Sequence, residues 1–481
     1  MKRFEIMAIL LAIIMVGIPQ LCIAEQEVLK VGEIQVTATR KKEGIVVAPS
    51  TTTINVDEYQ MPGIPQNVVD ILKDRAIIDF RGQSDLVPES DSVYMRGFDS
   101  RNFVTAQDGL AIEKTGGHWG GHFVDYSLIP LNQIECIEII PGPHSALYSG
   151  KALGGVINIK TKTPAKHEAP EADFKVTTSY RTYNTQNHSI DVQGGVDWFD
   201  YGLSYQKYHT DGYLRNNDAD MDTVSGRFGF ILPSDGYISL SASYTDKETG
   251  QPKINDPNPP VEAKNREAII ADYDPDYPVV KWDDVSSRWR NDPDRNPERY
   301  KEPYSLRLNI KQPTPIGSWT LGAYYSYDNQ VFDFKDMDEP QAKTCYTSWG
   351  GKIQDDIDLF DNHLITVGFD TAQLSSRYTR KIVESYAGFI QDKWKIIPRL
   401  TLTAGLRYEN MNIWWNNLQR FKEGIYVNPA KPRDYVKRGY NQVVPKSFLT
   451  YELDDLSDAL RDTSMSIGVS RIWTPRSFCE V

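Results

Sequence analysis

The feature that most limits the possible folds is a strict alternation of apolar and polar side chains in the last two thirds of the chain. In "YISLSASY" (237–244) the even-numbered residues are Ile, Leu, Ala and Tyr, whereas the odd-numbered ones are a tyrosine and three serines. "YSLRLNIK" (304–311) and "LTLTAGLRYE" (400–409) alternate in the same way. A period of two residues is that of a β-strand, so these segments are predicted to form a sheet with one apolar and one strongly polar face.

The links between these segments alternate as well. Short links such as "PSDG" (233–236) and "LFDN" (359–362) take turns with long ones at 209–222, 247–302, 329–345 and 413–443. Short turns on one rim and long loops on the other are typical of a transmembrane β-barrel. A soluble β-sandwich, the alternative, shares the alternation of side chains but not this pattern of connections. About 13 strands are expected from Asp173 to Trp473.

The N-terminus resembles an export signal. An uncharged apolar run from Ile6 to Ile18 follows two basic residues and precedes "LCIA". A membrane-spanning helix needs roughly 20 apolar residues, and this run is shorter. We therefore predict a secretory signal over residues 1–24, cleaved after Ala24. The formal net charge of −12 disfavours nucleic acid as a partner.

Between the signal and the alternating strands lies a region of mixed pattern. "PQNVVDILKDRAIIDF" places Val68, Val69, Ile71 and Leu72 at helical spacing, and short β-prone runs broken by glycine and proline follow. This region is predicted to be a small α+β unit, joined to the strands by a charged, proline-containing linker, "PAKHEAPEAD".

Motifs for enzymatic chemistry are absent from the sequence. "GPHSALYSG" is not a G-x-S-x-G elbow, and the chain has no H-E-x-x-H, no C-x-x-C and no phosphate-binding glycine loop. We predict neither an enzyme nor a cofactor. Three cysteines remain after cleavage of the signal, Cys136, Cys345 and Cys479, and their odd number and wide spacing argue against a disulfide framework. The acidic segment 247–302 lacks an EF-hand pattern and is predicted to be a solvated outer loop.

The segment "EIQVTATR" (33–40) is β-prone, contains no proline and lies ahead of any segment that could give it a core. Such an extended segment suits pairing with the edge of another protein's sheet, through main-chain hydrogen bonds. The order of signal, isolated strand, α+β unit and barrel strands resembles that of the TonB-dependent outer-membrane receptors. "IECIEIIPGPHSALYSGKALGGVINIKTK" resembles the end of that family's plug domain, and "YAGFIQDKWKIIPRLTLTAGLRYE" resembles one of its barrel hairpins.

The resemblance implies a transmembrane antiparallel β-barrel with an N-terminal α+β plug inside its lumen, in the outer membrane of a Gram-negative cell. The domains expected are a signal (1–24), a periplasmic extension with a TonB box (25–50), a plug (51–165) and a partial barrel (172–481). The barrel is expected to be incomplete, because the family's barrels have 22 strands and the residues after the plug are too few for them.

The resemblance also implies site residues. The TonB box corresponds to Ile34, Gln35, Val36, Thr37 and Ala38. The plug loop that faces the outer mouth corresponds to the glycine-rich "KTGGHWGGHFVDY", so ligand contacts are expected from His118, Trp119, His122, Phe123 and Tyr126. No metal site is predicted there, because a pair of histidines four apart binds metal on a helix and these glycines disfavour one.

Arg96 in "YMRGF" matches the plug arginine that pairs with barrel carboxylates in this family. Pro141 and Cys136 occupy two places where the family usually has further basic residues. Anchoring of the plug is therefore expected to depend on Arg96.

The function that the resemblance implies is energised uptake of a scarce nutrient. The expected partners are TonB, outer-membrane lipid and a small-molecule metal chelate, with a ferric siderophore as the commonest cargo. Haem or cobalamin are alternative cargoes of the same family. A truncated, inactive receptor is a further alternative, and a passive channel is less consistent with a plug and a TonB box.

Overall fold

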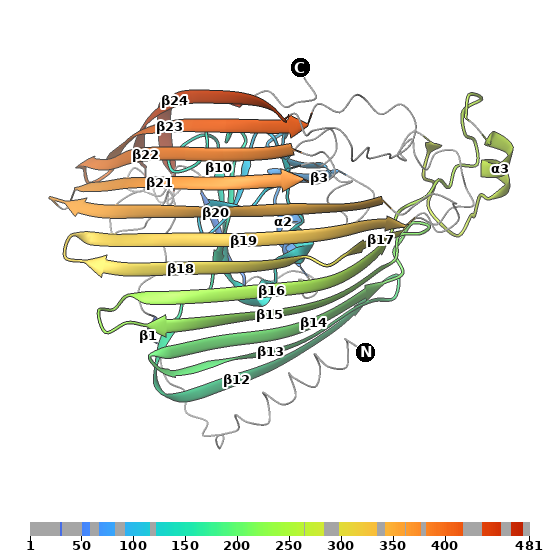
Figure 1. The fold of residues 1–481 in the computed structure, drawn as a ribbon, viewed down its shortest axis with the longest axis horizontal. Helices are drawn as coiled ribbons and strands as arrows, with labels where there is room; N and C mark the ends of the chain where they lie inside the picture. Colours follow the sequence, from blue (N-terminus) through green and yellow to red (C-terminus); the bar gives the residue numbers. More distant parts are fainter. Residues whose placement is uncertain are drawn as a thin grey trace.

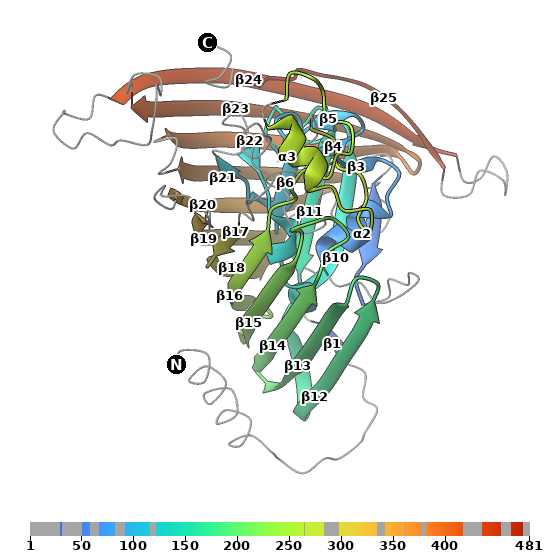
Figure 2. The same ribbon diagram turned by 90° about the vertical axis from the view of Figure 1, so that its right-hand side faces the viewer.

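The computed structural model describes residues 29–30, 51–57, 67–81, 92–115, 122–263, 265–282, 298–333, 342–360, 362–376, 381–416, 435–453 and 463–474. One large, curved antiparallel sheet wraps around a smaller α/β unit (Figure 1, Figure 2). The predicted signal and TonB box lie outside the described residues. No helix among the described residues is long and apolar enough to cross a membrane.

The large sheet follows the chain order from β12 to β25. Its strands are β12 (Ala165–Arg181), β13 (Thr185–Asp197), β14 (Phe199–Thr210), β15 (Ala219–Ile231), β16 (Tyr237–Gly250), β17 (Glu298–Lys301), β18 (Tyr304–Thr314), β19 (Gly317–Asp333), β20 (Ala342–Leu359), β21 (His363–Ser376), β22 (Lys381–Ile397), β23 (Leu400–Asn416), β24 (Tyr435–Glu452) and β25 (Ser464–Ser470). The short strand β1 (Leu29–Lys30) pairs with β12. Short turns gather at one end of the strands, and the longest connection, which carries α3 (Arg266–Ala271), lies at the other (Figure 1). The predicted asymmetry of the connections is thus confirmed.

Strands β17 and β18 are parts of one interrupted strand. Both pair with β16 and with β19, and the register is the same on either side of the break. Pro303, which has no N–H to donate, lies in the break, and its carbonyl accepts from the N–H of Thr245 at 3.0 Å. Counted in this way, β12 to β25 make 13 strands in the described part of the chain, the number expected from the sequence.

The two faces of the sheet differ as the alternation predicts. Leu306 and Leu406 on the outer face are 52% and 47% exposed, whereas Asn309 and Arg407 on the inner face are 5% and 4% exposed. Aromatic rings cluster on the outer face near both ends of the strands. One such cluster is Trp198, Phe199, Phe228 and Phe230 at the short-turn end, and another is Tyr304, Tyr325 and Tyr327 toward the long-loop end. An apolar band between aromatic girdles is the surface that a barrel presents to lipid.

The first barrel strand begins earlier than predicted. The segment expected to be a linker before residue 172 forms the first part of β12, which starts at Ala165. The pairing of β12 with β13 shifts between His167 and Glu171. Pro170 falls within this shift, where the ladder needs no N–H from it. The prediction of a linker was wrong because a proline was taken as evidence against a strand.

The predicted outer loop 247–302 is also partly structured. Strand β16 continues to Gly250, and α3 lies within the connection that follows. Arg215 of the neighbouring loop binds Asp272 at 2.9 Å. A small apolar cluster joins the two loops, formed by Leu214, Ile254, Ala263, Ile269 and Val280.

The inner unit is a five-stranded sheet with one helix and several short elements. Its sheet has the order β2-β10-β11-β6-β7. The elements are β2 (Thr52–Asn55), α2 (Val68–Lys73), β3 (Ile78–Arg81), β4 (Ser92–Met95), β5 (Phe98–Asp99), β6 (Val104–Gln107), β7 (Leu110–Ala111), β8 (Lys114–Thr115), β9 (His122–Phe123), η2 (Tyr126–Leu128), η3 (Leu131–Gln133), β10 (Ile134–Pro141) and β11 (Gly155–Thr161). The unit fills the concave side of the large sheet, as a plug (Figure 2).

Helix α2 begins at Asn67, whose side chain accepts hydrogen bonds from the N–H groups of Val69 (2.8 Å) and Asp70 (3.2 Å). The four apolar residues predicted at helical spacing are all buried. They pack against isoleucines of the plug sheet, among them Ile137, Ile139 and Ile157. The plug therefore has a hydrophobic core of its own, and a smaller apolar cluster joins it to Phe389 of β22.

Candidate functional site

The plug is joined to the barrel wall by buried ion pairs around Asp125. Lys301 Nζ lies 3.0 Å and Lys247 Nζ 3.5 Å from Asp125 Oδ2, and the Asp125 side chain is fully buried. The Ser127 hydroxyl donates to Asp125 Oδ1 at 2.6 Å. Burial raises the pKa of Asp125, but the two lysine charges and the Ser127 hydrogen bond outweigh burial, and the pKa lies below its usual range. Asp125 is therefore a carboxylate that two barrel strands hold in place.

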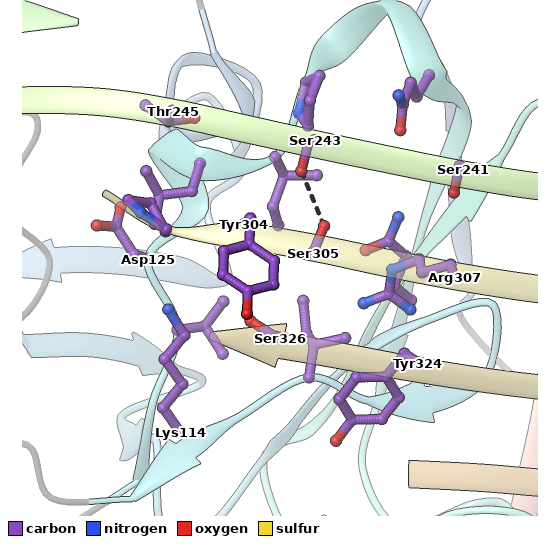
Figure 3. A pocket seen from close by; sticks show the side chains of 18 residues that line it. Lys114, Asp125, Ser241, Ser243, Thr245, Tyr304, Ser305, Arg307, Tyr324 and Ser326 are labelled. Atoms are coloured by element: carbon purple, nitrogen blue, oxygen red, sulfur yellow. Dashed lines mark hydrogen bonds between the residues drawn. The ribbon is translucent and has the colours of Figure 1, made fainter. Parts of the chain in front are cut away.

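A second ion pair fixes the other stem of the same hairpin. Lys114 Nζ on β8 lies 2.7 Å from Asp328 Oδ2 on β19, and both side chains are buried. Lys114 of β8 pairs with Phe123 of β9, and Asp125 lies two residues after the end of β9. Figure 3 shows the pocket to which Lys114 and Asp125 of the plug contribute together with Arg307 and Tyr324 of the wall. The β8–β9 hairpin is thus attached to the wall at both stems.

The predicted ligand-contacting residues fall within 118–126 of the sequence, and only some of them are described. His118 and Trp119 lie outside the described residues, and the structure describes only the backbone of His122 and Phe123, in β9. Tyr126 is 1% exposed in the plug core, its hydroxyl lies 2.7 Å from Thr105 Oγ1, and its ring packs on Phe80. Tyr126 therefore has no surface that a ligand could contact, and we assign it a structural role instead.

Arg96 occupies an exposed turn with a φ of 54°, and its N–H donates to the carbonyl of Ile77 at 2.8 Å. No carboxylate of the described residues forms an ion pair with its guanidinium. The anchoring contacts that the structure describes do not involve Arg96. At Asp125 the charges are reversed relative to the prediction, because the plug supplies the carboxylate and the barrel supplies the cations.

A second set of anchors holds the backbone of plug segment 145–150. The N–H of Gly150 donates to Glu409 Oε1 on β23 at 3.0 Å. Lys446 Nζ on β24 donates to the carbonyl of Ser145 at 2.6 Å. Because these bonds are made to main-chain atoms, they depend on the path of the plug backbone and little on its side chains. Glu409 was predicted only as a member of a polar face, and no role was predicted for Lys446.

Close packing accompanies these bonds at Gly405 on β23. A Cβ at position 405 would lie 2.6 Å from the Cβ of Ala146, closer than two carbons can pack. The N–H of Ala146 donates to Gln391 Oε1 on the adjacent strand at 3.0 Å. Glycine at 405 is therefore what allows the plug backbone to reach the wall.

A cavity of about 370 Å³ lies between the plug and strands β21, β22 and β23, and Tyr324 of β19 also lines it. Its apolar wall includes Leu110, Leu147, Leu374, Val383, Met411 and Ile413. Its polar wall centres on Arg407, which donates to both oxygens of Asp370 (2.8 and 2.9 Å) and to Glu409 (2.7 Å). Mixed walls and a volume of this order are typical of sites for small molecules.

Among the described residues, no group of three or more His, Cys, Asp or Glu side chains is placed to hold a metal ion. Cys136 is buried and Cys345 is half-buried, both as free thiols.

Comparison with known families agrees with the fold. Residues 46–156 match the TonB-dependent Receptor Plug Domain, and residues 346–461 match an outer membrane beta barrel domain. The chain belongs to the TonB-dependent outer-membrane receptors. Its place is the outer membrane of a Gram-negative bacterium, and the proteins it resembles are receptors and transporters, not enzymes.

Individual relatives of the receptor share part of its sequence. It is 23% identical over 403 residues to a hemin receptor of Yersinia enterocolitica, covering 78% of this chain and 52% of the relative. It is 33% identical over 242 residues to the vitamin B12 transporter BtuB of Vibrio vulnificus, covering 46% of this chain and 39% of the relative. The solved structure of the copper transporter OprC has the same fold, with a TM-score of 0.67 at 14% identity, covering 88% of this chain and 64% of that one. The receptor chain thus spans about half the length of these curated relatives.

Proposed function

We propose that the receptor binds a ferric siderophore at its outer mouth and imports it with energy delivered by TonB. The observation that carries this proposal is the cavity of about 370 Å³ between the plug and strands β21 to β23. A passive channel would have no use for a plug fixed by buried ion pairs. A receptor that must release its plug on demand uses such contacts, because they hold the plug only while their partners stay in place.

The proposed ligand contacts are His122 and Phe123 of β9, together with His118 and Trp119, which stand between β8 and β9 in the sequence. Attachment of both stems to the wall reduces the freedom that a binding loop loses when a ligand arrives. The proposed TonB contacts are Ile34, Gln35, Val36, Thr37 and Ala38, which precede the plug and would add a strand to TonB.

The choice of cargo is the part of the proposal that needs experiment first. The relatives named above are a hemin receptor and a vitamin B12 transporter, so haem and cobalamin are the competing cargoes. The receptor would be produced in a Gram-negative host that lacks its own siderophore, haem and cobalamin receptors, with and without TonB. Uptake of radioactive iron from a panel of ferric siderophores, of haem and of labelled cobalamin would then be measured.

We expect saturable uptake of at least one ferric siderophore in the TonB-containing host and surface binding without uptake in the host without TonB. Uptake of haem or cobalamin alone would overturn the siderophore assignment and leave the receptor class intact. Uptake that is the same in both hosts would overturn the energised mechanism.

A further inference from the structure

Two lysines on the inner face of the wall are buried without a hydrogen-bond acceptor among the described residues. Lys352 on β20 is 5% exposed and Lys393 on β22 is 3% exposed. Neither Nζ atom has a hydrogen-bond acceptor. Buried lysines are ordinarily paired, because an unpaired ammonium away from water costs several kcal/mol. The carboxylates of Asp370 and Asp356 attract Lys352, and those of Asp356 and Glu138 attract Lys393, but none of them accepts a hydrogen bond from either lysine. Both positions therefore lack a direct anionic contact.

The surroundings of Lys352 connect it with the cavity. Its Nζ lies 5.3 Å from the ring centroid of Phe389 and 6.0 Å from that of Tyr148. Tyr148 belongs to the plug, lines the cavity and is 3% exposed, and its hydroxyl also has no hydrogen-bond partner. Tyr148 thus contacts the cavity with one part of its surface and Lys352 with another.

Strand register places the two lysines in sequence along the wall. Lys352 pairs with Asp370, which lines the cavity. Lys393 pairs with Leu364, at the short-turn end of the same strands. The inner face of β20 to β22 thus carries two lysines that form no hydrogen bond. Lys352 lies next to the cavity, and Lys393 lies near the short-turn rim.

We infer that β20 to β22 form the wall along which an anionic chelate passes the plug. Lys352 receives the oxyanion groups of the chelate after Tyr148 moves aside, and Lys393 receives them near the periplasmic rim. The inference rests on the proposed function, because it assumes inward transport. It specifies the class of ligand, one that carries carboxylate, catecholate or similar oxygen anions. It also explains why two costly unpaired cations remain where methionine would pack.

The anion sites can be tested without knowing the cargo. Purified receptor in detergent would be melted in inorganic phosphate and in chloride of equal ionic strength. The variants are the double replacement Lys352→Met with Lys393→Met, and the control Lys311→Met, at a buried inner-face lysine of β18 that does have a partner. The control also measures the general stabilisation that phosphate gives to any protein.

We expect phosphate to raise the melting temperature of the wild type and of Lys311→Met by similar amounts and to raise that of the double variant much less. In chloride, the double variant should melt no lower than the wild type, because it loses unpaired charges. An equal phosphate effect in all three proteins would overturn the inference. If the double variant does not fold, Lys352→Gln and Lys393→Gln are measured in the same way.

Transport provides the second measurement. Surface binding of an imported ferric siderophore should be unchanged in the double variant, while its uptake rate falls by about tenfold, equivalent to about 1.4 kcal/mol in the transport barrier. Unchanged uptake would overturn the route. If the wild type imports no ferric siderophore, the proposed function fails, and the phosphate result still decides whether the two lysines form anion sites.

Discussion

Lys301 Nζ of the barrel lies 3.0 Å from Asp125 Oδ2 of the plug, and both side chains are almost fully buried. Lys247 approaches the same carboxylate from β16 at 3.5 Å. Removing the shared carboxylate would leave two ammonium groups side by side without their counter-ion. The stability of the plug in the barrel should therefore depend strongly on Asp125.

The first prediction is that Asp125→Asn lowers the free energy of unfolding by about 3–5 kcal/mol, the cost of breaking a buried ion pair from one side. Denaturant unfolding of the purified receptor measures it. The control is Asp74→Asn, because Asp74 pairs with Arg75 at 2.9 Å on the surface, with 59% of its side chain exposed. Its loss should cost less than about 1 kcal/mol. Equal effects of the two replacements would contradict the assigned role of Asp125.

The second prediction concerns the close contact of Gly405 with Ala146. Gly405→Ala should destabilise the receptor by about 1–3 kcal/mol, because the added Cβ forces the plug backbone away from the wall. Gly388→Ala on the adjacent strand is the control, since a Cβ there meets no atom within 4 Å. Melting followed by circular dichroism compares the two variants. A melting temperature of Gly405→Ala at or above that of the control would show that the contact is not tight.

The third prediction is a pH dependence of stability due to His144. Burial and the positive charges of Arg96 and Lys446 lower the pKa of His144, against an opposing effect of the Pro141 carbonyl. A histidine with a lowered pKa in the folded state contributes its stability above its unfolded pKa, about 6.5, and loses it as pH falls through the folded value. The receptor should therefore become less stable between about pH 7 and pH 5.

The control for this effect is His144→Phe, which keeps an aromatic ring against Phe448, where the two rings now lie 4.6 Å apart. Melting temperatures of both proteins over this pH range make the comparison. The melting temperature of the variant should fall less between pH 7 and pH 5 than that of the wild type. A decline of the same size in both proteins would assign it to other groups.

The fourth prediction concerns the proposed TonB segment. Val36→Pro removes an N–H from the strand that TonB would pair with, and should abolish uptake while leaving surface binding of the ligand intact. Val36→Ala keeps the N–H and should retain most of the uptake. Both rates are read from the radioactive uptake assay. Normal transport by the proline variant would rule out residues 33–39 as the contact.

The fifth prediction concerns the β8–β9 hairpin. Replacing His118, Trp119 and His122 together with alanine should weaken ligand binding by more than about 1 kcal/mol if they form a desolvated contact. The barrel should stay folded, because a loop tip has few core contacts. Titration with ferric siderophores, haem and cobalamin measures the affinity, and unchanged affinity would remove the hairpin as the recognition site.

Tyr126→Phe is the matched control for the hairpin. It removes the hydrogen bond to Thr105 and should cost about 1 kcal/mol of stability without changing affinity. A loss of affinity in this variant would restore Tyr126 to the ligand site.

Sequence patterns predicted the faces of the barrel strands because lipid on one side and a polar plug on the other impose opposite demands on alternate residues. The same argument placed Arg407 and Glu409 on the inner face before any contact was known. It failed at the start of β12, where Pro170 is accommodated by a shift in the ladder. Such shifts depend on the partner strand and leave no local signal in the sequence.

The plug contacts were beyond sequence reasoning for a different reason. Asp125 and Lys301 are 176 residues apart, and their meeting depends on how the plug rotates inside the wall. Tyr126 was assigned to the ligand because it lies beside a glycine-rich loop. A tyrosine combines an apolar ring with a hydroxyl. In the plug core the Tyr126 ring packs on Phe80, and its hydroxyl forms a hydrogen bond with Thr105.

Lys247 and Lys301 are direct cross-strand neighbours on β16 and β17. Like charges in this position repel each other, and the plug carboxylate that contacts both lysines offsets this repulsion. An empty barrel would have to close this part of its rim against that repulsion, whereas a barrel that closes around a folded plug would not. The order of events during assembly in the membrane is thereby constrained, and the plug is expected to be in place before β16 and β17 complete their pairing.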